Sequence, residues 1–460
     1  MASKHLNSVS FVVLALILIG STAWGAGFAV NGIGTKATSL GGGFRGLADD
    51  WSACFWNPAG LGFLESSELN TSLSASLFLP KYNPDVLYGD LYEVGFKNGA
   101  YRYPENRFYF LPNFSGFYKL PKQNIVVGMG FYTSYELESH YWSVFEPLPG
   151  YDNLVSYPKD DYGPNIMIVD FHPTLAKAFS EKLSLGLGLS FNWADFKLTK
   201  VTLAQTGYDA PLQNIPIDSK LKMDGWGVGF NLGMLYKISP KMQMGVSITS
   251  PVNIKVEGDM NYTAYLPNHI EVDTSFTGGT LASIPKAKAT LNLPASAGVG
   301  FAYFSSDKLT FTFDGSWTGW SRWDELEVNL TGKDPFGETA TSPTLAYNWN
   351  DVFKIALGCE YMYKDKLAIR GGYSFESSLI PNSTLDIIVP DVGPKHGFSL
   401  GLGYEFENNI ELGLGQQLVL SPSKTIDKIE DANNDGVYDN LPGEYGNMSY
   451  STHLSLTYRF

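Results

Sequence analysis

The sequence predicts an all-β protein: a closed antiparallel transmembrane barrel of about fourteen strands with an N-terminal plug in its lumen. Three observations favour this fold. Aromatic residues make up 14% of the chain and glycine contributes 48 residues, yet beyond the N-terminus no apolar run reaches the ~20 residues of a spanning helix. Apolar residues alternate with small or polar ones. The loops between the alternating segments are alternately short and long, as in outer-membrane barrels.

The first element is an N-terminal export signal. Lys4 and His5 precede an apolar run at 11–19, and small residues follow it at 20–23. A basic start, a short apolar run and a small-residue cleavage site are typical of a secretory signal peptide, and the run is too short for a membrane anchor. We therefore expect 1–25 to be a signal peptide and the mature chain to start at Ala26.

The stretch ADDWSACFWNPAGLGF (48–63) fits neither a helix nor a strand. Its proline and glycines interrupt a helix, and its apolar residues are too irregular for a strand. We predict that 26–66 form a compact plug ahead of a barrel at 67–460. Because Cys54 lies in this plug while Cys359 shares a strand face with apolar residues, we expect no disulfide between them.

The barrel strands are predicted from alternation of period two. In LSLGLGLSFNW (183–193) leucine and aromatic side chains share one face, and serine, glycine and asparagine share the other; FSLGLGYEFE (398–407) repeats this pattern. The last strand ends in Phe460, like the terminal strands that the outer-membrane insertion machinery recognises. We expect strands near 68–82, 107–120, 124–138, 162–179, 183–202, 220–238, 242–259, 288–305, 309–328, 349–363, 366–377, 396–407, 410–420 and 449–460.

Composition excludes several classes of function. The formal net charge of -14 argues against nucleic-acid binding. Two cysteines in an exported chain of this length exclude a disulfide scaffold. The six histidines are scattered, and no nucleophile elbow, paired-histidine metal motif or phosphate loop is present. The sequence therefore predicts a protein that is not an enzyme and requires no cofactor.

Short motifs in order along the chain resemble one family of transporters. The series GFAVNGIGTKATSLGGGFRGLADD (27–50), Asn57-Pro58-Ala59, TLNLPASAGVGF (290–301), WTGWSRWDEL (317–326) and VPDVGPKHGFSLGLGYEF (389–406) resembles the FadL family of outer-membrane transporters for long-chain fatty acids and related hydrocarbons. The resemblance implies a fourteen-stranded barrel plugged by an N-terminal hatch. It also implies a lumen pocket beside the hatch and lateral exit at an inward kink in the third strand.

Site residues are predicted in the hatch and the third strand. The turn Asn57-Pro58-Ala59-Gly60 is expected either to pack the hatch or to act directly in gating. Glycine within a strand commonly marks a bend, so the kink implied by the resemblance is placed at Gly128, Gly130 and Phe131, although other strands contain glycines too. Hatch charges are expected at Arg45, Asp49 and Asp50.

Alternation places Arg370 and Glu376 inside the lumen, since a lipid-facing arginine costs roughly 2–4 kcal/mol at the midplane. Arg370 is expected to pair either with a ligand carboxylate or, as we favour, with Asp49 or Asp50. Arg45 has the same two interpretations.

Two predictions concern the long loops. Aromatic residues at Tyr101, Tyr103, Phe108 and Trp142 are candidates for an extracellular capture groove. In DANNDGVYDNLPGE (431–444), Asp431, Asn433, Asp435, Val437 and Asp439 match positions of a calcium loop, but position 12 is Pro442. This loop is either a shortened calcium site or an acidic turn.

The sequence therefore predicts a multi-pass protein of a Gram-negative-type outer membrane, in contact with lipid and lipopolysaccharide and monomeric. The expected function is passive uptake of hydrophobic molecules, foremost long-chain fatty acids, captured at an extracellular apolar groove. The alternatives are an aromatic hydrocarbon or alkane channel of the same fold, an adhesin or phage-receptor barrel, and a simple aqueous porin.

Overall fold

The structure is a computed structural model that describes residues 26–84, 103, 109–138, 162–205, 214–266, 274, 278–364, 366–435 and 438–460. The predicted signal peptide, Tyr101, Phe108, Trp142 and Val437 lie outside these residues. Among the described residues, no helix is long and apolar enough to cross a membrane.

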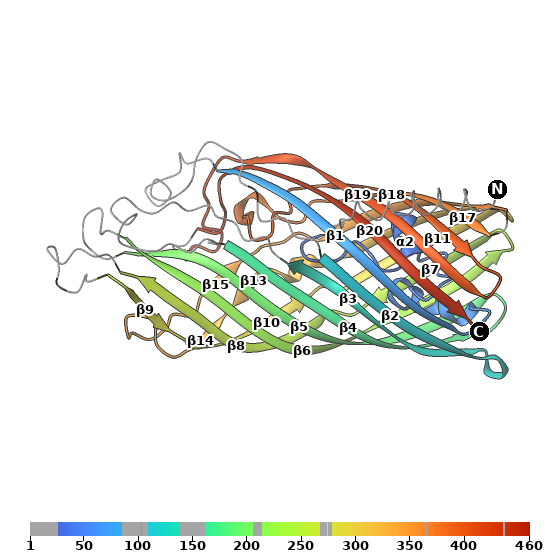
Figure 1. Cartoon of the computed structure of the whole chain (residues 1–460), viewed down its shortest axis with the longest axis horizontal. Helices are drawn as coiled ribbons and strands as arrows, with labels where there is room; N and C mark the ends of the chain where they lie inside the picture. The colour runs from blue at the N-terminus through green and yellow to red at the C-terminus, as the bar shows by residue number, and fades with distance from the viewer. Residues whose placement is uncertain are drawn as a thin grey trace, which may run out of the picture.

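The chain forms one closed antiparallel barrel of fourteen strands, which confirms the predicted fold class (Figure 1). The wall is closed by the pairing of the first strand with the last, from Glu68↔Arg459 to Pro84↔Gly443. The fourteen strand positions of the wall are occupied by sixteen segments, because two positions each hold two segments. The segments are β1 (Glu68–Pro84), β2 (Tyr109–Leu120), β3 (Ile125–Glu138), β4 (Tyr162–Ala178), β5 (Leu183–Gln205), β6 (Asn214–Ser239), β7 (Met242–Thr249), β8 (Val252–Tyr265), β10 (Lys286–Leu293), β11 (Ser296–Ser306), β12 (Leu309–Thr318), β16 (Val352–Tyr363), β17 (Leu367–Glu376), β18 (Lys395–Glu405), β19 (Ile410–Ile426) and β20 (Gly443–Arg459).

Two wall strands that the sequence predicts as continuous are interrupted. Strands β7 and β8 are separated at Ser250-Pro251, and β10 and β11 at Pro294-Ala295. Proline has no N–H to donate to a ladder, which explains both positions. Each pair still occupies one position in the wall, because β6 pairs with both β7 and β8, while β11 pairs with β7 and β10 with β8.

The outer face is a belt of apolar side chains. Leu400, Val228 and Phe353 are 69%, 63% and 61% exposed, an arrangement that suits hydrocarbon rather than water. Both cysteines are free, as predicted, with Cys54 buried and Cys359 half-buried. The C-terminus lies at the end that carries the short turns, which marks the periplasmic side (Figure 1).

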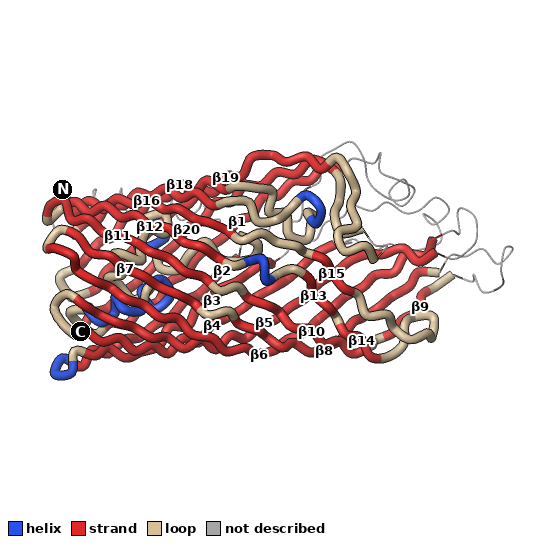
Figure 2. Tube along the Cα trace, turned by 180° about the vertical axis from the view of Figure 1, so that it is seen from behind, coloured by secondary structure: helices blue, strands red, loops and turns tan. Residues whose placement is uncertain are grey.

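The N-terminal segment 26–66, called the hatch below, lies inside the barrel. It contains α2 (Thr35–Ser39), α3 (Ala53–Trp56) and the 3-10 helix η1 (Pro58–Phe63). These helical turns gather in the half of the barrel nearest the C-terminus (Figure 2). Hatch side chains such as Leu40, Phe44 and Trp51 are buried with wall residues that include Phe117 of β2.

The predicted strand 309–328 is wrong beyond Thr318. The chain turns away from the wall there through η3 (Trp320–Arg322), and Trp320, Trp323 and Leu326 are buried in the lumen. The remaining short elements are β9 (Thr280–Ser283) and β14 (Asn329–Thr331), which extend the wall sheet, the separate pair β13 (Glu325–Glu327) and β15 (Thr344–Ala346), and the turns η2 (Pro121–Gln123) and η4 (Asn382–Thr384).

Candidate functional site

The inner face of the wall changes character along the barrel axis. On β4, Ile166 and Ile168 face inward on the extracellular side, whereas Asp170 and His172 face inward beside the hatch, and all four are buried. On β8 the buried side chains are Val252, Ile254, Val256, Met260 and Ala264, all of them apolar. An open aqueous channel needs a polar lining. The extracellular half of this lumen is apolar instead, and the charged and polar groups are concentrated around the hatch.

An aromatic cluster fills the centre of the apolar half. The ring centroid of Phe28, at the start of the hatch, lies 5.1 Å from Trp320, 5.1 Å from Trp323 and 5.9 Å from Trp349. The three tryptophans come from the 319–351 segment, which folds into the lumen. Among the described residues, the indole N–H groups of Trp323 and Trp349 have no hydrogen-bond partner. The cluster is therefore an aromatic surface that carries two indole donors without partners in the described part of the chain.

A cavity of about 170 Å³ lies between this cluster and the hatch. Its lining includes Val30, Trp320 and the side chain of Lys354 on β16. Lys354 donates to Asn31 Oδ1, and its Nζ lies 3.9 Å from Glu376 Oε2. Glu376, predicted inside the lumen, is 3.4 Å from Lys395 Nζ. The cavity thus combines an aromatic wall with an ammonium group whose contact with the Glu376 carboxylate is long.

The Asn57 turn connects the hatch to the wall. Asn57 Nδ2 donates to the carbonyls of Arg45 (2.9 Å) and Met234 of β6 (3.1 Å), and its Oδ1 accepts from Ala59 N. Ala59 O accepts from Ser184 Oγ of β5 at 2.6 Å. At Gly60 a Cβ would lie 1.9 Å from Ala48 O, so only glycine fits. The turn satisfies buried backbone groups that water cannot reach.

Arg45 is held by the wall rather than left for a ligand. Its Nη1 lies 3.3 Å from Asp314 Oδ2 of β12, its Nε donates to Ser247 Oγ at 3.1 Å, and its guanidinium lies over Trp56 at 5.4 Å. Four separate contacts, counting the backbone N–H that donates to Asp314 at 2.9 Å, fix this side chain in place.

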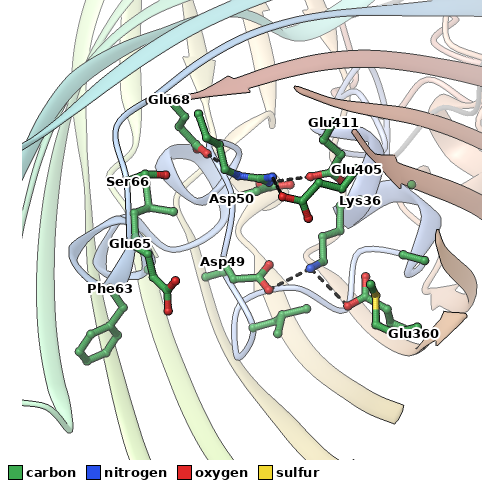
Figure 3. Close-up of a pocket in the computed structure, with 18 of the residues that line it drawn as sticks. Lys36, Asp49, Asp50, Phe63, Glu65, Ser66, Glu68, Glu360, Glu405 and Glu411 are labelled. Carbon is green, nitrogen blue, oxygen red and sulfur yellow. Dashed lines mark hydrogen bonds and ion pairs between the residues drawn. The ribbon is translucent and has the colours of Figure 1, made fainter. Parts of the chain in front are cut away.

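The periplasmic end of the hatch forms a charged pocket of about 500 Å³ (Figure 3). Lys36 Nζ lies 2.9 Å from Asp49 and 3.4 Å from Glu360 of β16. Burial alone lowers the pKa of Lys36, but Asp49 and Glu360 together raise it well above its usual range. Burial raises the pKa of Asp50 to about 6, although Ser52 donates to it.

The favoured pairing of Arg370 with Asp49 or Asp50 is wrong. Arg370 Nε lies 2.6 Å from Glu360 Oε2, and Nη2 lies 3.6 Å from Glu411. Glu360 is the direct cross-strand partner of Arg370, and such pairs are close enough to interact. The hatch cation that joins this group is Lys36, which sequence reasoning missed because alternation says nothing about hatch side chains.

The third strand is irregular, but not at the predicted glycines. Gly128 and Gly130 are in regular register with β2 and β4. A Cβ at Gly130 would lie 3.1 Å from Cys54 Sγ, so this glycine makes room for the hatch. The register with β4 shifts between Thr133 and Tyr135. The bend therefore lies at Ser134.

Strand β2 pairs with β3 only on the periplasmic side of this bend. Their last pair toward the extracellular side is Phe114↔Phe131. Beyond it the hatch takes the place of β2: Val30 N donates to Ser134 O at 3.3 Å and Glu136 N donates to Phe28 O at 2.7 Å. The wall therefore has an interruption between β2 and β3, and hatch backbone covers the exposed edge.

The capture groove and the calcium site in the long loops stay predictions. Tyr103 is 65% exposed. Asp431 and Asn433 each accept from Asp435 N at 3.1 Å, and Asp439 accepts from Ala432 N at 2.7 Å. Within the described part of the chain, no group of three or more His, Cys, Asp or Glu side chains is arranged to hold a metal ion.

Comparison with known proteins gives a consistent family. The family model described as "Outer membrane protein transport protein (OMPP1/FadL/TodX)" matches residues 16–460. A long-chain fatty acid transport protein of Escherichia coli O6:H1 is 25% identical over 437 residues, covering 90% of this chain and 91% of its own. One from Salmonella typhi is 25% identical over 451 residues, covering 93% and 95%.

Solved structures share the fold. A Pseudomonas aeruginosa FadL homologue superposes with a TM-score of 0.75 at 20% identity, covering 95% of this chain and 100% of its own. The P. putida toluene transporter TodX gives 0.70 at 15% identity, covering 94% and 99%.

Proposed function

The chain belongs to the OMPP1/FadL/TodX family of outer membrane transport proteins, and from that premise we propose that its cargo is a long-chain fatty acid. Its family transports hydrophobic compounds across the outer membrane. Uptake would be passive, driven by the concentration gradient and by consumption inside the cell. Aromatic residues of the extracellular loops, Tyr101, Tyr103, Phe108 and Trp142, would capture the ligand first.

The apolar half of the lumen supports a hydrophobic cargo. Inward-facing side chains such as Ile168, Ile254 and Leu291 pack in its core. Val30, Val252 and Leu293 line the cavity beside it together with Trp320. Burial of an alkyl chain there gains about 0.8 kcal/mol per CH₂. Such a lining favours an alkyl or aryl group over a sugar or an ion.

Lys354 is the single observation that favours a fatty acid over an uncharged hydrocarbon. A buried ammonium needs a partner, and the Glu376 carboxylate that pairs with it is 3.9 Å away. Glu376 is shared with Lys395, which also pairs with Asp391 at 2.6 Å. A ligand carboxylate in the adjoining cavity would give Lys354 a closer anionic partner than Glu376, with its alkyl chain against the aromatic cluster. Its approach would loosen the Lys354–Asn31 contact to the hatch.

Exit would be lateral, between β2 and β3. The carboxylates and cations around Lys36 form a charged barrier at the periplasmic end, which an alkyl chain crosses only at high cost. On the extracellular side of Phe114↔Phe131, β3 bonds to hatch backbone in place of β2, so an opening there requires only that the hatch edge leave. We propose that the hatch residues Phe28 to Val30 leave the β3 edge when ligand passes.

The test is uptake of labelled oleate and labelled toluene by cells that lack their own transporter. Lys354→Met should lower oleate uptake and leave toluene uptake unchanged, whereas Lys354→Arg should retain both. If Lys354→Met lowers neither, the ammonium does not read the head group. Loss of both in a normally inserted barrel would indicate a structural role.

The alternatives are separated by the same cells. An aromatic hydrocarbon channel, favoured by the four-ring cluster, would take up toluene without competition from oleate. An adhesin or phage receptor would take up neither. An aqueous porin would show steady ion conductance in a planar bilayer. Calcium binding by 431–444 stays a prediction, and calorimetry of the whole protein without heat at millimolar calcium would remove it.

A further inference from the structure

The lipid-facing wall contains an apolar groove of about 500 Å³ across β11, β12, β16 and β17. Its lining is almost entirely carbon, with Tyr303, Phe311 and Leu357 along its sides and Cys359 and Gly371 on its floor. The groove faces outward, because Phe311 and Leu357 belong to the exposed apolar belt. It is therefore separate from the lumen and from the transport route.

The groove exists because two successive cross-strand pairs between β16 and β17 consist of residues with small side chains or none. Gly358 is opposite Gly372, and Cys359 is opposite Gly371. The first pair faces the lumen, where a Cβ at Gly372 would lie 2.2 Å from Gly41 N of the hatch. The second pair faces the lipid, where the nearest atom to a Cβ at Gly371 is 3.9 Å away. Since Phe311 and Leu400 flank this pair across the sheet, a notch results.

The groove lies in the periplasmic half of the membrane. Cys359 precedes Tyr363, the last residue of β16, by four positions. With a rise of about 3.3 Å per residue and a strand tilt near 40°, this places the notch roughly 10 Å from the periplasmic rim of an apolar band about 25 Å tall. An occupant from the surrounding lipid would come from the periplasmic leaflet.

The rim below the groove carries cations. The turn between β11 and β12 contains exposed Lys308, and the turn between β16 and β17 contains exposed Lys364 and Lys366. Lys366 is 2.9 Å from Glu407, and the sequence also places Asp307 and Asp365 in these turns. Lys364 Nζ lies over the Tyr363 ring at 5.1 Å. A lysine at this depth is suited to a lipid phosphate.

We propose that this groove holds one acyl chain of a glycerophospholipid of the periplasmic leaflet, with the lipid phosphate at Lys364. The groove is continuous with the lipid-facing belt, so hydrocarbon is the only solvent available to it. Filling an apolar notch with an ordered chain recovers contacts that mobile lipid makes less well. The proposal is independent of which ligand the lumen carries.

The experiment is native mass spectrometry of the full-length protein in mild detergent with added dioleoylphosphatidylglycerol. The wild-type barrel should retain one lipid. Gly371→Leu with Cys359→Leu, which fills the notch, should reduce retention roughly tenfold. Lys364→Glu should reduce it less, and phosphate-free dioleoylglycerol should be retained more weakly than the phospholipid.

Gly315→Leu is the matched control, because Gly315 on β12 also has open space at its Cβ but does not line the groove. Heat-modifiable migration reports folding, and Gly371→Leu alone serves if the double variant does not fold. Equal retention by the filled variant and the control would overturn the proposal. So would a protein dimer that is lost on filling, because the groove would then hold a second copy.

Discussion

Lys36 of the hatch lies 3.4 Å from Glu360 of β16, and Glu360 in turn lies 2.6 Å from Arg370 of β17. This contact joins the plug electrostatically to the wall at the periplasmic end. Glu360 keeps Arg370 when the lysine is removed, so the wall can stay satisfied while the hatch loses this one of its several contacts with the wall. The hatch and the barrel can therefore be perturbed separately.

Lys36→Met is expected to loosen the hatch without unfolding the barrel. The Asp49 side chain is 43% exposed, so loss of its pair with Lys36 costs no more than about 1 kcal/mol, and the main effect is the lost contact between Lys36 and Glu360 of the wall. The measurement is ion conductance in planar bilayers, which should rise in amplitude and frequency of opening. Lys366→Met, which removes an exposed rim pair with Glu407, is the control and should conduct like the wild type. Unchanged conductance of Lys36→Met would show that the ion pair does not hold the hatch.

Asn57→Ala is expected to destabilise the hatch turn and to lower oleate uptake. The substitution leaves the carbonyl of Arg45 without the Asn57 donor, at about 1–3 kcal/mol for an unsatisfied buried group. It also removes the contact with the carbonyl of Met234, which stays paired within the sheet between β5 and β7. Limited proteolysis of the purified barrel should show faster cleavage within 45–60. Asn57→Asp, which keeps the acceptor for Ala59 N but loses both donors, should be intermediate or worse. A Pro58→Ala variant that inserts normally and transports at full rate would exclude Pro58 from the mechanism.

The sequence was sufficient to predict the barrel because alternation and loop lengths depend only on local chemistry. It was not sufficient for the interruptions at Pro251 and Pro294, where a strand continues in the wall after a break. It also missed the infolding of the 319–351 segment, although Trp320 and Trp323, three positions apart, do not fit the period-two alternation of a wall strand. Whether such a segment stays in the wall or folds into the lumen is decided by tertiary packing.

The same limit applies to the candidate site. Alternation placed Arg370 inside, and the structure has it buried. Its partner depended on strand register, which sets Glu360 directly opposite. The sequence does not predict the roles of Lys36 and Lys354, because lysines are common in short helices and near the ends of strands. Gly128 and Gly130 predict a bend from the sequence alone. In the structure, Gly130 makes room for Cys54 of the hatch, and Gly128 allows β2 to approach closely.

The hatch is expected to be more stable at pH 5 than at pH 7.5 through Asp50. The pKa of Asp50 is about 6 in the folded hatch, against an ordinary value of 3.8. A carboxyl whose pKa is raised by folding lowers the stability of the folded state when it is ionised. This loss of stability is fully present above about pH 6, and it is relieved as the pH falls from 6 toward 3.8 and the carboxyl is protonated. Hydrogen exchange of hatch peptides, corrected for intrinsic rates, measures this. Asp50→Asn should flatten the profile, and an unaltered profile would assign the pH dependence to another group.

Tethering the hatch to β3 is expected to block oleate uptake reversibly. Ala29 and Tyr135 form an isolated antiparallel bridge, and the flanking bonds Val30 N to Ser134 O and Glu136 N to Phe28 O make it a non-hydrogen-bonded pair. Such pairs bring Cα atoms to about 4.5 Å, within the range of a disulfide. Ala29→Cys with Tyr135→Cys, in a Cys359→Ser background, should therefore close when oxidised. Because Cys54 is fully buried, it should not compete.

Oxidation should lower oleate uptake by the tethered variant, and a reductant should restore it. The single variants Ala29→Cys and Tyr135→Cys control for the loss of each side chain and should not respond to oxidant. If lateral exit requires the hatch edge to leave β3, the tether removes that step while the aromatic cluster and the Lys354 cavity stay in place. Binding of oleate by the oxidised protein should then persist although uptake is lost. Full uptake by a fully oxidised barrel would mean that ligand leaves by a route that does not displace Phe28 to Val30.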